Sequence, residues 1–365
     1  MTPTTPTDRG GAAMAFDDVA DRIVMFGGGE NIYAQTPVPA DTWEYDGTTW
    51  HVRVPAASSP GPRREITMGY DSTRGVLVMF GGRGPVGDLA ETWELDGTTW
   101  TNRTAALGAS PPAQAYVRTA YDSVRERMVI AGGYGFGTQT WEYTGATWVS
   151  GAGLAQIFYL GALAYDDARM RLVIQSGASS GVTQEYITGT WQNRTPTATP
   201  PARGTGAMAF DQRRGRVVMF GGWTNGPPTY FADTWEFENS SWIKRTPTTS
   251  PPGRYYNAMA YDSKRGKVVM FGGFDGGPRG DTWLYDGTTW SQVGGAGPSA
   301  RYGAAMAYDP RTERVVLFGG AVGNNSRLGD TWTFDGAAWT QVNTPTAPPA
   351  RAIATLVDDA RRGVM

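Results

Sequence analysis

The sequence repeats one unit seven times. Each copy has an apolar run that ends in Gly-Gly, then a variable stretch, then a hairpin with the pattern Thr-Trp…Trp, as in AAMAFDDVADRIVMFGG followed by DTWEYDGTTW. The glycine pairs begin at Gly27, Gly81, Gly132, Gly221, Gly272 and Gly319, and a degraded copy has Ser176-Gly177. Successive copies are 44 to 54 residues apart. A repeat of this period that is built only of strands predicts a β-propeller with one blade per copy.

The repeat runs through the 365 residues without a break, so residues 1–365 are expected to form a single domain. Residues 349–365 begin an eighth copy, and the sequence ends inside what would be its second strand. Either this partial repeat helps to close the ring, or the chain is a fragment of a longer array. The abrupt stop within a strand favours the fragment.

Each copy predicts four strands, which in the first copy cover residues 11–16, 22–26, 41–45 and 48–52. The second strand is apolar without alternation, as expected where blades cover both faces of a sheet. The first strand is rich in Ala and Gly, which suits the crowded centre of a ring. Asp46-Gly47 is the dipeptide favoured by a two-residue hairpin turn, and such a turn would place Trp43 opposite Trp50.

The unit VVMFGG…DTWEYDGTTW resembles the kelch repeat, in which a diglycine closes the second strand and spaced aromatic residues end in Trp. The resemblance covers essentially the whole chain. The hairpin turn is shorter than in the usual kelch form and is similar to that of bacterial kelch proteins. The resemblance implies an all-β, kelch-type β-propeller, and seven copies favour seven four-stranded blades. It implies little about activity, because this fold carries both enzymes and binding modules.

An arginine precedes the first strand in most copies, and an acidic residue opens the third strand of the same copies. The pairs are Arg9 with Asp41, Arg63 with Glu91, Arg203 with Asp233, Arg254 with Asp281 and Arg301 with Asp330. The third copy has Gln114 with Gln139, and the fourth has Phe158 with Val182. This joint replacement predicts that each arginine binds its acidic partner, because a buried charge cannot lose its partner without cost. The arginines are therefore expected to be mainly structural, although their arrangement resembles a substrate-binding ring.

The links between strands divide between the two faces of the ring. The link between the first and second strands and the link between the third and fourth strands are short and repetitive. The link between the second and third strands and the link from one copy to the next are long, variable and rich in aromatic residues. The long-loop face is therefore the predicted functional surface, although its aromatic residues can also pack against neighbouring loops. The third and fourth copies break the pattern; for example, Gln175 replaces the usual Phe. Either the repeat has drifted at these positions, or a specialised pocket lies beside these two blades. The candidate binding residues are Gln114, Tyr116, Arg118, Tyr134, Phe136, Phe158, Tyr159, Gln175, Trp223, Tyr255, Arg279 and Tyr302.

Several classes of chemistry are disfavoured by composition. The chain has no cysteine, and His51 is its single histidine, which argues against thiolate chemistry, a Ser–His–Asp triad and a multi-histidine metal site. No catalytic residue, metal or other cofactor is predicted. The net charge of −2 gives no general attraction to nucleic acid, and no apolar run is long enough to insert into a membrane.

Two classes of function remain. The first is a non-catalytic scaffold that binds a protein or a glycan on the long-loop face. The second is a carbohydrate-active enzyme, such as a kelch-type sugar mutarotase or epimerase, which would need convergent acids beside arginine. Glu30, Glu65, Asp88 and Asp275 are the acids without an expected partner, and their scatter over different blades favours the scaffold. The compartment stays open: the bacterial cell surface or secretion if a leader precedes this sequence, and otherwise the cytoplasm.

Overall fold

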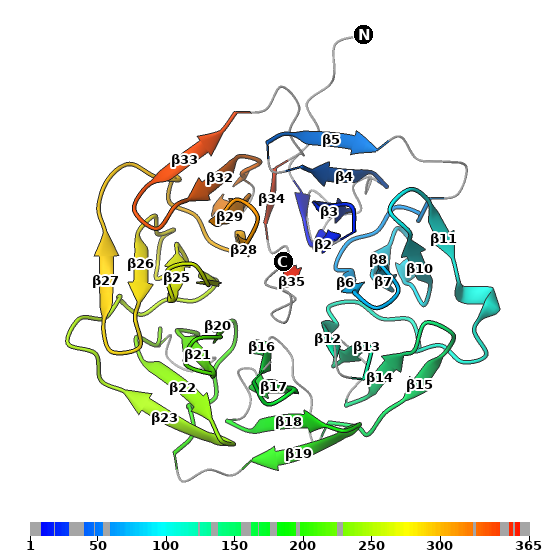
Figure 1. The fold of residues 1–365 in the computed structure, drawn as a ribbon, viewed down its shortest axis with the longest axis horizontal. Coiled ribbons are helices and arrows are strands. Elements are labelled where there is room, and N and C mark those ends of the chain that lie inside the picture. Colours follow the sequence, from blue (N-terminus) through cyan, green and yellow to red (C-terminus); the bar gives the residue numbers. More distant parts are fainter. Residues whose placement is uncertain are drawn as a thin grey trace.

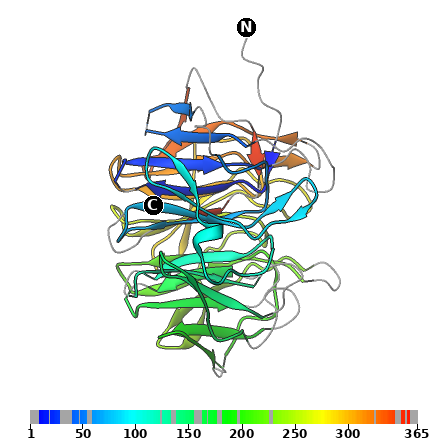
Figure 2. The same cartoon turned by 90° about the vertical axis from the view of Figure 1, so that its right-hand side faces the viewer.

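The chain folds into seven four-stranded antiparallel sheets arranged as blades around a central axis, which confirms the predicted seven-bladed β-propeller (Figure 1). This computed structural model describes residues 9–17, 19–28, 40–46, 48–53, 59–122, 125–132, 138–154, 162–166, 168–175, 181–194, 198–224, 229–323, 326–343, 350–352 and 355–357. In the edge-on view the strands run across the thickness of the ring, so the links between them gather on its two faces (Figure 2).

Each blade follows the chain outward from the axis. Blade 1 contains β2 (Ala13–Asp17), β3 (Arg22–Phe26), β4 (Thr42–Tyr45) and β5 (Trp50–Arg53). Blade 2 contains β6 (Thr67–Asp71), β7 (Val76–Phe80), β10 (Thr92–Leu95) and β11 (Trp100–Asn102). Blade 3 contains β12 (Arg118–Asp122), β13 (Arg127–Ala131), β14 (Thr140–Tyr143) and β15 (Trp148–Ser150). Blade 4 contains β16 (Ala162–Asp166), β17 (Arg171–Gln175), β18 (Thr183–Ile187) and β19 (Thr190–Arg194).

The remaining blades have the same order. Blade 5 contains β20 (Ala207–Asp211), β21 (Arg216–Phe220), β22 (Thr234–Glu238) and β23 (Ser241–Arg245). Blade 6 contains β24 (Ala258–Asp262), β25 (Lys267–Phe271), β26 (Thr282–Tyr285) and β27 (Trp290–Val293). Blade 7 contains β28 (Ala305–Asp309), β29 (Arg314–Phe318), β32 (Thr331–Phe334) and β33 (Trp339–Val342). Short hairpins in the loops pair β8 (Arg83–Gly84) with β9 (Gly87–Asp88), and β30 (Ala321–Gly323) with β31 (Ser326–Arg327).

Two short segments from the end of the sequence lie beside its beginning. β34 (Arg351–Ala352) pairs in parallel with β1 (Arg9–Gly10), and β35 (Thr355–Val357) pairs in parallel with β2. Blade 1 thereby becomes a five-stranded sheet with β35 at its inner edge. The described part of residues 349–365 therefore contacts the first blade.

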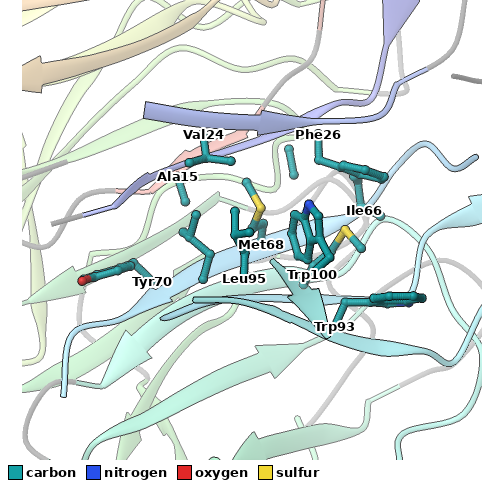
Figure 3. Packing of buried hydrophobic residues seen from close by; sticks show 12 residues of the cluster. Ala15, Val24, Phe26, Ile66, Met68, Tyr70, Trp93, Leu95 and Trp100 are labelled. Atoms are coloured by element: carbon teal, nitrogen blue, oxygen red, sulfur yellow. The ribbon is translucent and has the colours of Figure 1, made fainter. Parts of the chain in front are cut away.

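The hydrophobic core lies between the blades. One cluster joins Val24 and Phe26 of blade 1 to Met68, Leu95 and Trp100 of blade 2 (Figure 3), and other clusters join the remaining neighbours around the ring. The second strand is buried on both sides, because Val24 and Phe26 face blade 2 while Met25 faces blade 7. Fully burying one side chain of this size contributes about 1.5–3 kcal/mol. The stacking of blades therefore explains the apolar strand without alternation.

The predicted hairpin register is wrong by two residues, because the turn lies one position further along the chain than expected. Tyr45 pairs with Trp50, and Trp43 pairs with Val52, so the two tryptophans are not cross-strand neighbours. The cause is Asp46, whose carboxylate accepts the backbone N–H groups of Thr48 and Thr49 at 2.8 Å each. Asp46 is therefore the first residue of the turn, and Asp96 accepts from Thr98 and Thr99 in the same way. Gly97, which follows Asp96, has φ +90° and takes the first central position, where a type II′ turn requires glycine.

The fourth-strand tryptophan of each blade instead ties that blade to the preceding one. Trp100 Nε1 donates to Thr42 Oγ1 at 2.9 Å, and Trp50 Nε1 donates to Thr331 Oγ1 at 2.9 Å, which joins blade 1 to blade 7. The other five contacts are Trp148 with Thr92, Trp191 with Thr140, Trp242 with Thr183, Trp290 with Thr234 and Trp339 with Thr282, at 2.7–2.8 Å. These seven hydrogen bonds are called the indole–threonine contacts below.

Candidate functional site

Buried arginines fix the base of the long-loop face. Arg254 donates to both carboxylate oxygens of Asp281, at 2.6 and 2.8 Å, and also to the carbonyl oxygens of Gly272 and Pro252. Its own carbonyl accepts the N–H of Gly222 in blade 5 at 2.8 Å. Arg254 thus binds two loops of its own blade and one loop of the preceding blade, and Arg63 and Arg301 do the same.

The predicted arginine–acid pairs are confirmed in four blades. Arg203 with Asp233 and Arg301 with Asp330 have the same two-pronged geometry as Arg254 with Asp281, and Arg63 binds Glu91. The side chain of Arg9 lies outside the description. Burial alone would raise the pKa of Asp281, but the hydrogen bonds and charge of Arg254 outweigh it, so the pKa is lowered. These arginines are therefore structural.

The first glycine of each pair is required where two blades meet. Gly221 has φ +78°, and a Cβ atom there would lie 2.4 Å from the carbonyl oxygen of Arg254. Gly272 is in the same position, with φ +66° and 2.4 Å to the carbonyl oxygen of Arg301. Any other residue would combine an unfavourable backbone angle with a clash. The diglycine is therefore part of the blade junction, which leaves the variable loop beyond it to differ between copies.

A continuous cluster of six aromatic side chains lies on the long-loop face over blades 5, 6 and 7. Tyr255 is its centre: its ring centroid lies 5.6 Å from Tyr230, 5.8 Å from Trp223 and 5.6 Å from Phe274. Its members are Trp223, Tyr230, Tyr255, Tyr256, Phe274 and Tyr302, and we call it the aromatic cluster. All six are only partly buried. The surface therefore presents ring faces together with phenol hydroxyls.

The backbone places these rings by a simple rule. In blades 2, 5, 6 and 7, the residue after the diglycine forms an antiparallel bridge with the residue after the arginine, as between Phe274 and Tyr255 and between Ala321 and Tyr302. Both positions therefore meet on the loop face. Burial, followed by the neighbouring phenols Tyr230 and Tyr302, raises the pKa of Tyr255. Its hydroxyl is consequently a neutral donor and acceptor at ordinary pH.

The next residue along each loop adopts a left-handed backbone. Glu65, Tyr116, Thr205 and Tyr256 occupy this equivalent position with φ between +52° and +59°. Backbone hydrogen bonds link successive blades there, because Tyr116 N donates to Glu65 O and Tyr256 N donates to Thr205 O. Such angles are unfavourable for residues other than glycine and are concentrated at functional sites.

The structure brings together three of the candidate binding residues, Trp223, Tyr255 and Tyr302, and Arg279 lies in the adjoining loop. Gln114 and Gln175 are buried inside their blades, and Gln175 accepts a hydrogen bond from Thr183. Tyr116 lies in the left-handed position, and Arg118 begins β12. Four other candidates lie outside the described residues: Tyr134, Phe136, Phe158 and Tyr159. The pocket expected beside blades 3 and 4 thus falls largely on residues that are not described.

Sequence reasoning left Tyr230, Tyr256 and Phe274 out of the candidate set, although all three are loop aromatics. Phe274 follows a diglycine directly, as Trp223 does, so this spacing was a usable signal. Tyr230 has no comparable signal, since it joins the cluster through a bridge to Trp223 within one loop.

At least two of the four acids expected to lack a partner form ion pairs. Asp88 accepts from Arg83 at 2.7 Å, and Asp275 accepts from Arg279 at 2.7 and 2.5 Å, so for these two the expectation is wrong. Glu65 also has an interaction partner, and Glu30 lies outside the description. Among the residues that the structure describes, no group of three or more His, Asp or Glu side chains could hold a metal ion. In that same part of the chain, no helix is long and apolar enough to cross a membrane.

No protein-family model matches the sequence, and a search of curated proteins found no match to it.

Proposed function

We propose that this chain is a kelch-type, non-catalytic binding scaffold that holds a protein or glycan partner on its long-loop face. The aromatic cluster is the observation that carries this proposal. Six partly exposed rings in contact with one another form an amphipathic surface, and aromatic residues of this kind dominate the binding energy of interfaces. The diglycine, the spaced tryptophans and the arginine that binds the diglycine carbonyl support the kelch resemblance.

The charge of this surface indicates the chemistry of the partner. Arg279 is 48% exposed at its side chain, but its guanidinium is held by Asp275, so the loop contributes no net charge. Tyr255, Tyr230 and Tyr302 supply phenol hydroxyl groups. The surface therefore suits a neutral partner that stacks on rings and accepts or donates hydrogen bonds.

A mutarotase or epimerase has less support. It would need a carboxylate free to move a proton, whereas Asp88 and Asp275 each bind an arginine in a neighbouring position. No specific observation favours this second function over binding.

The test compares the wild-type chain with Tyr255→Ala and Trp223→Ala on a glycan array and a peptide library. Each variant should weaken binding by about 10- to 30-fold, the loss typical of a central aromatic residue at an interface. Val86→Ser is the matched control, because Val86 is 99% exposed in the loop between β8 and β9 of blade 2 and should leave binding unchanged. Binding that survives both aromatic substitutions would overturn the proposal. Turnover of a sugar would favour the enzyme instead.

A further inference from the structure

A polar arrangement of four side chains recurs between neighbouring blades, close to the short turns. At the junction of blades 2 and 3, Arg74 binds both Asp71 and Glu94, and the hydroxyl of Tyr143 donates to Glu94 at 2.9 Å. The same set, which we call the polar quartet, is formed by Asp122, Arg125, Glu142 and Tyr186, and by Asp211, Arg214, Glu236 and Tyr285. In each case the guanidinium lies 5.0–5.2 Å from the centroid of the tyrosine ring.

Only half of this quartet is present where blade 7 meets blade 1. Asp309 and Tyr45 take the aspartate and tyrosine positions, but Thr312 stands at the arginine position and Thr333 at the glutamate position. The guanidinium and the carboxylate of the quartet positions are therefore missing from this junction. Another guanidinium lies at its rim: Arg311 donates to the carbonyl oxygen of Asp46 at 2.8 Å and binds Asp21 at 3.3 Å, with Asp309 at 4.0 Å. The two losses carry opposite charges, so the site loses no net charge.

A cavity of about 180 Å³ lies at this place. It is lined by Tyr45, Asp309, Thr312, Arg314 and Thr333, together with two valines. Cavities of about 150 Å³ hold a molecule of the size of benzene. The space thus accommodates a small organic molecule with the dimensions of a free amino acid, and its polar lining excludes a purely apolar occupant.

Arg314 is the cation that the missing glutamate would bind. The residue at its position in other blades binds the glutamate of the third strand: Arg22 binds Glu44, Arg127 binds Glu142, Arg171 binds Glu185 and Arg216 binds Glu236, at 2.7–2.9 Å. With Thr333 in place of glutamate, the guanidinium of Arg314 forms no hydrogen bond, and no ion pair within 4 Å, with any described residue. A carboxylate under its influence is that of Asp335, whose pKa is lowered by the backbone N–H groups of Ala338 and Ala337 and then by the charge of Arg314. Arg314 is partly exposed, and the cavity is not fully enclosed.

The other charged group of the cavity has the opposite sign. Asp309 is buried, and its carboxylate accepts hydrogen bonds from the Arg311 and Thr312 backbone and from the Thr312 hydroxyl. Burial, followed by the charges of Asp309 and Asp46, raises the pKa of Tyr45 to about 12, so its hydroxyl stays neutral. The negative charge of Asp309 would repel an anion that enters the cavity alone, and the positive charge of Arg314 would repel a cation that enters alone.

We propose that this cavity binds a small zwitterion of the size of a free amino acid. Its carboxylate replaces the missing glutamate on Arg314 and the Thr333 hydroxyl. Its cationic nitrogen takes the place of the guanidinium that Thr312 lacks, on the side of Asp309 away from Arg311 at the rim. The bound molecule completes the polar quartet and contacts both blades of the junction. It therefore stabilises the closed ring, independently of any ligand on the long-loop face.

The test measures thermal unfolding and saturation-transfer NMR of the intact chain with glycine, alanine, glutamine, arginine and glycine betaine. At about a hundred times its dissociation constant, a zwitterion should raise the unfolding midpoint of a chain of this length by about 3 °C. Sodium acetate and methylammonium chloride at the same concentration should leave the midpoint unchanged, because each satisfies one charge and opposes the other.

Two variants locate the effect. Arg314→Gln removes the anion partner, and the double variant Thr312→Arg/Thr333→Glu rebuilds the quartet and fills the cavity, so both should abolish the shift. Lys267→Gln is the matched control: it changes the equivalent position of blade 6, where Leu284 and Phe334 pack in one buried cluster, and should retain the shift. If the double variant does not fold, Arg314→Gln decides the question. The proposal is overturned if no zwitterion gives a shift or an NMR contact, if acetate alone gives an equal shift, or if the shift persists in Arg314→Gln.

Discussion

Replacing Arg254 with alanine tests the blade junction most directly. The Arg254 side chain is 0% exposed, and it binds Asp281 through two hydrogen bonds of 2.6 and 2.8 Å and the carbonyls of Gly272 and Pro252. Removing one partner of a buried ion pair costs about 3–5 kcal/mol. The Asp281 side chain is 18% exposed, so water relieves part of its lost pairing. We therefore expect Arg254→Ala to lower the free energy of unfolding by about 4 kcal/mol.

A double-mutant cycle separates the pair from its surroundings. Arg254→Ala, Asp281→Ala and the double variant are unfolded in urea and followed by tryptophan fluorescence, and we expect a coupling energy of about 2 kcal/mol. The matched control is the exposed pair of Lys264 and Glu313, at 2.7 Å, which should show no resolvable coupling. A coupling for the buried pair within about 0.5 kcal/mol of zero would refute the reasoning.

The natural third blade supplies a second test of the same pair. Gln114 and Gln139 occupy the arginine and acid positions there. Arg254→Gln combined with Asp281→Gln should therefore be more stable than Arg254→Gln alone, because the double exchange leaves no partly buried carboxylate without a cation. Equal or lower stability of the double variant would show that the joint replacement in blade 3 has another origin.

Four further outcomes follow from the blade contacts. Trp290→Phe removes the hydrogen bond to Thr234 and part of a buried ring, and should lower the free energy of unfolding in urea by about 2 kcal/mol; an unchanged midpoint would contradict the indole–threonine contact. Gly221→Ala should destabilise the chain more than Gly277→Ala, since a Cβ at Gly277 meets no atom within 4 Å; equal effects in thermal unfolding would refute the steric argument. Because Arg254 lowers the pKa of Asp281 against the effect of burial, its stabilisation is present at neutral pH and should be lost as the pH falls below about 4; unfolding between pH 7 and pH 3 measures this, and Asp281→Asn should flatten the profile. Burial and Glu94 raise the pKa of Tyr143 to about 12, so stability should fall as the pH rises from about 10 to 12, and less so in Tyr143→Phe; an identical decline in the variant would assign the effect to other groups.

The number of blades could be predicted from the sequence because the repeat period and the strand pattern agree with one another. The hairpin register could not be predicted, because the dipeptide Asp-Gly is compatible with two turns. Asp is the first central residue in one of them, and Gly is the first central residue in the other. The side chain of Asp46 decides between them by accepting the N–H groups of Thr48 and Thr49. This is a local hydrogen bond whose geometry no spacing rule reports.

The candidate site was predictable only in part. The arginine–acid pairs could be predicted because both members change together between copies. The pair of Asp275 with Arg279 could also have been predicted, since the two residues lie four positions apart in one loop. The aromatic cluster depends on bridges between loops, which bring Tyr255 beside Trp223 and Phe274. The cavity depends on a contact between the first and last blades, so Thr312 and Thr333 look unremarkable until Tyr45 lies beside them.

The seven indole–threonine contacts make every junction of the ring the same in kind, including the one between blades 7 and 1. A blade that carries its own tryptophan and its own threonine meets the requirements of both neighbours, whatever its loops contain. Blades of this design are therefore interchangeable, because a blade copied to another position in the ring can form the same hydrogen bonds with its new neighbours. A gene built in this way can acquire new loops by duplication and exchange while the ring that displays them stays intact.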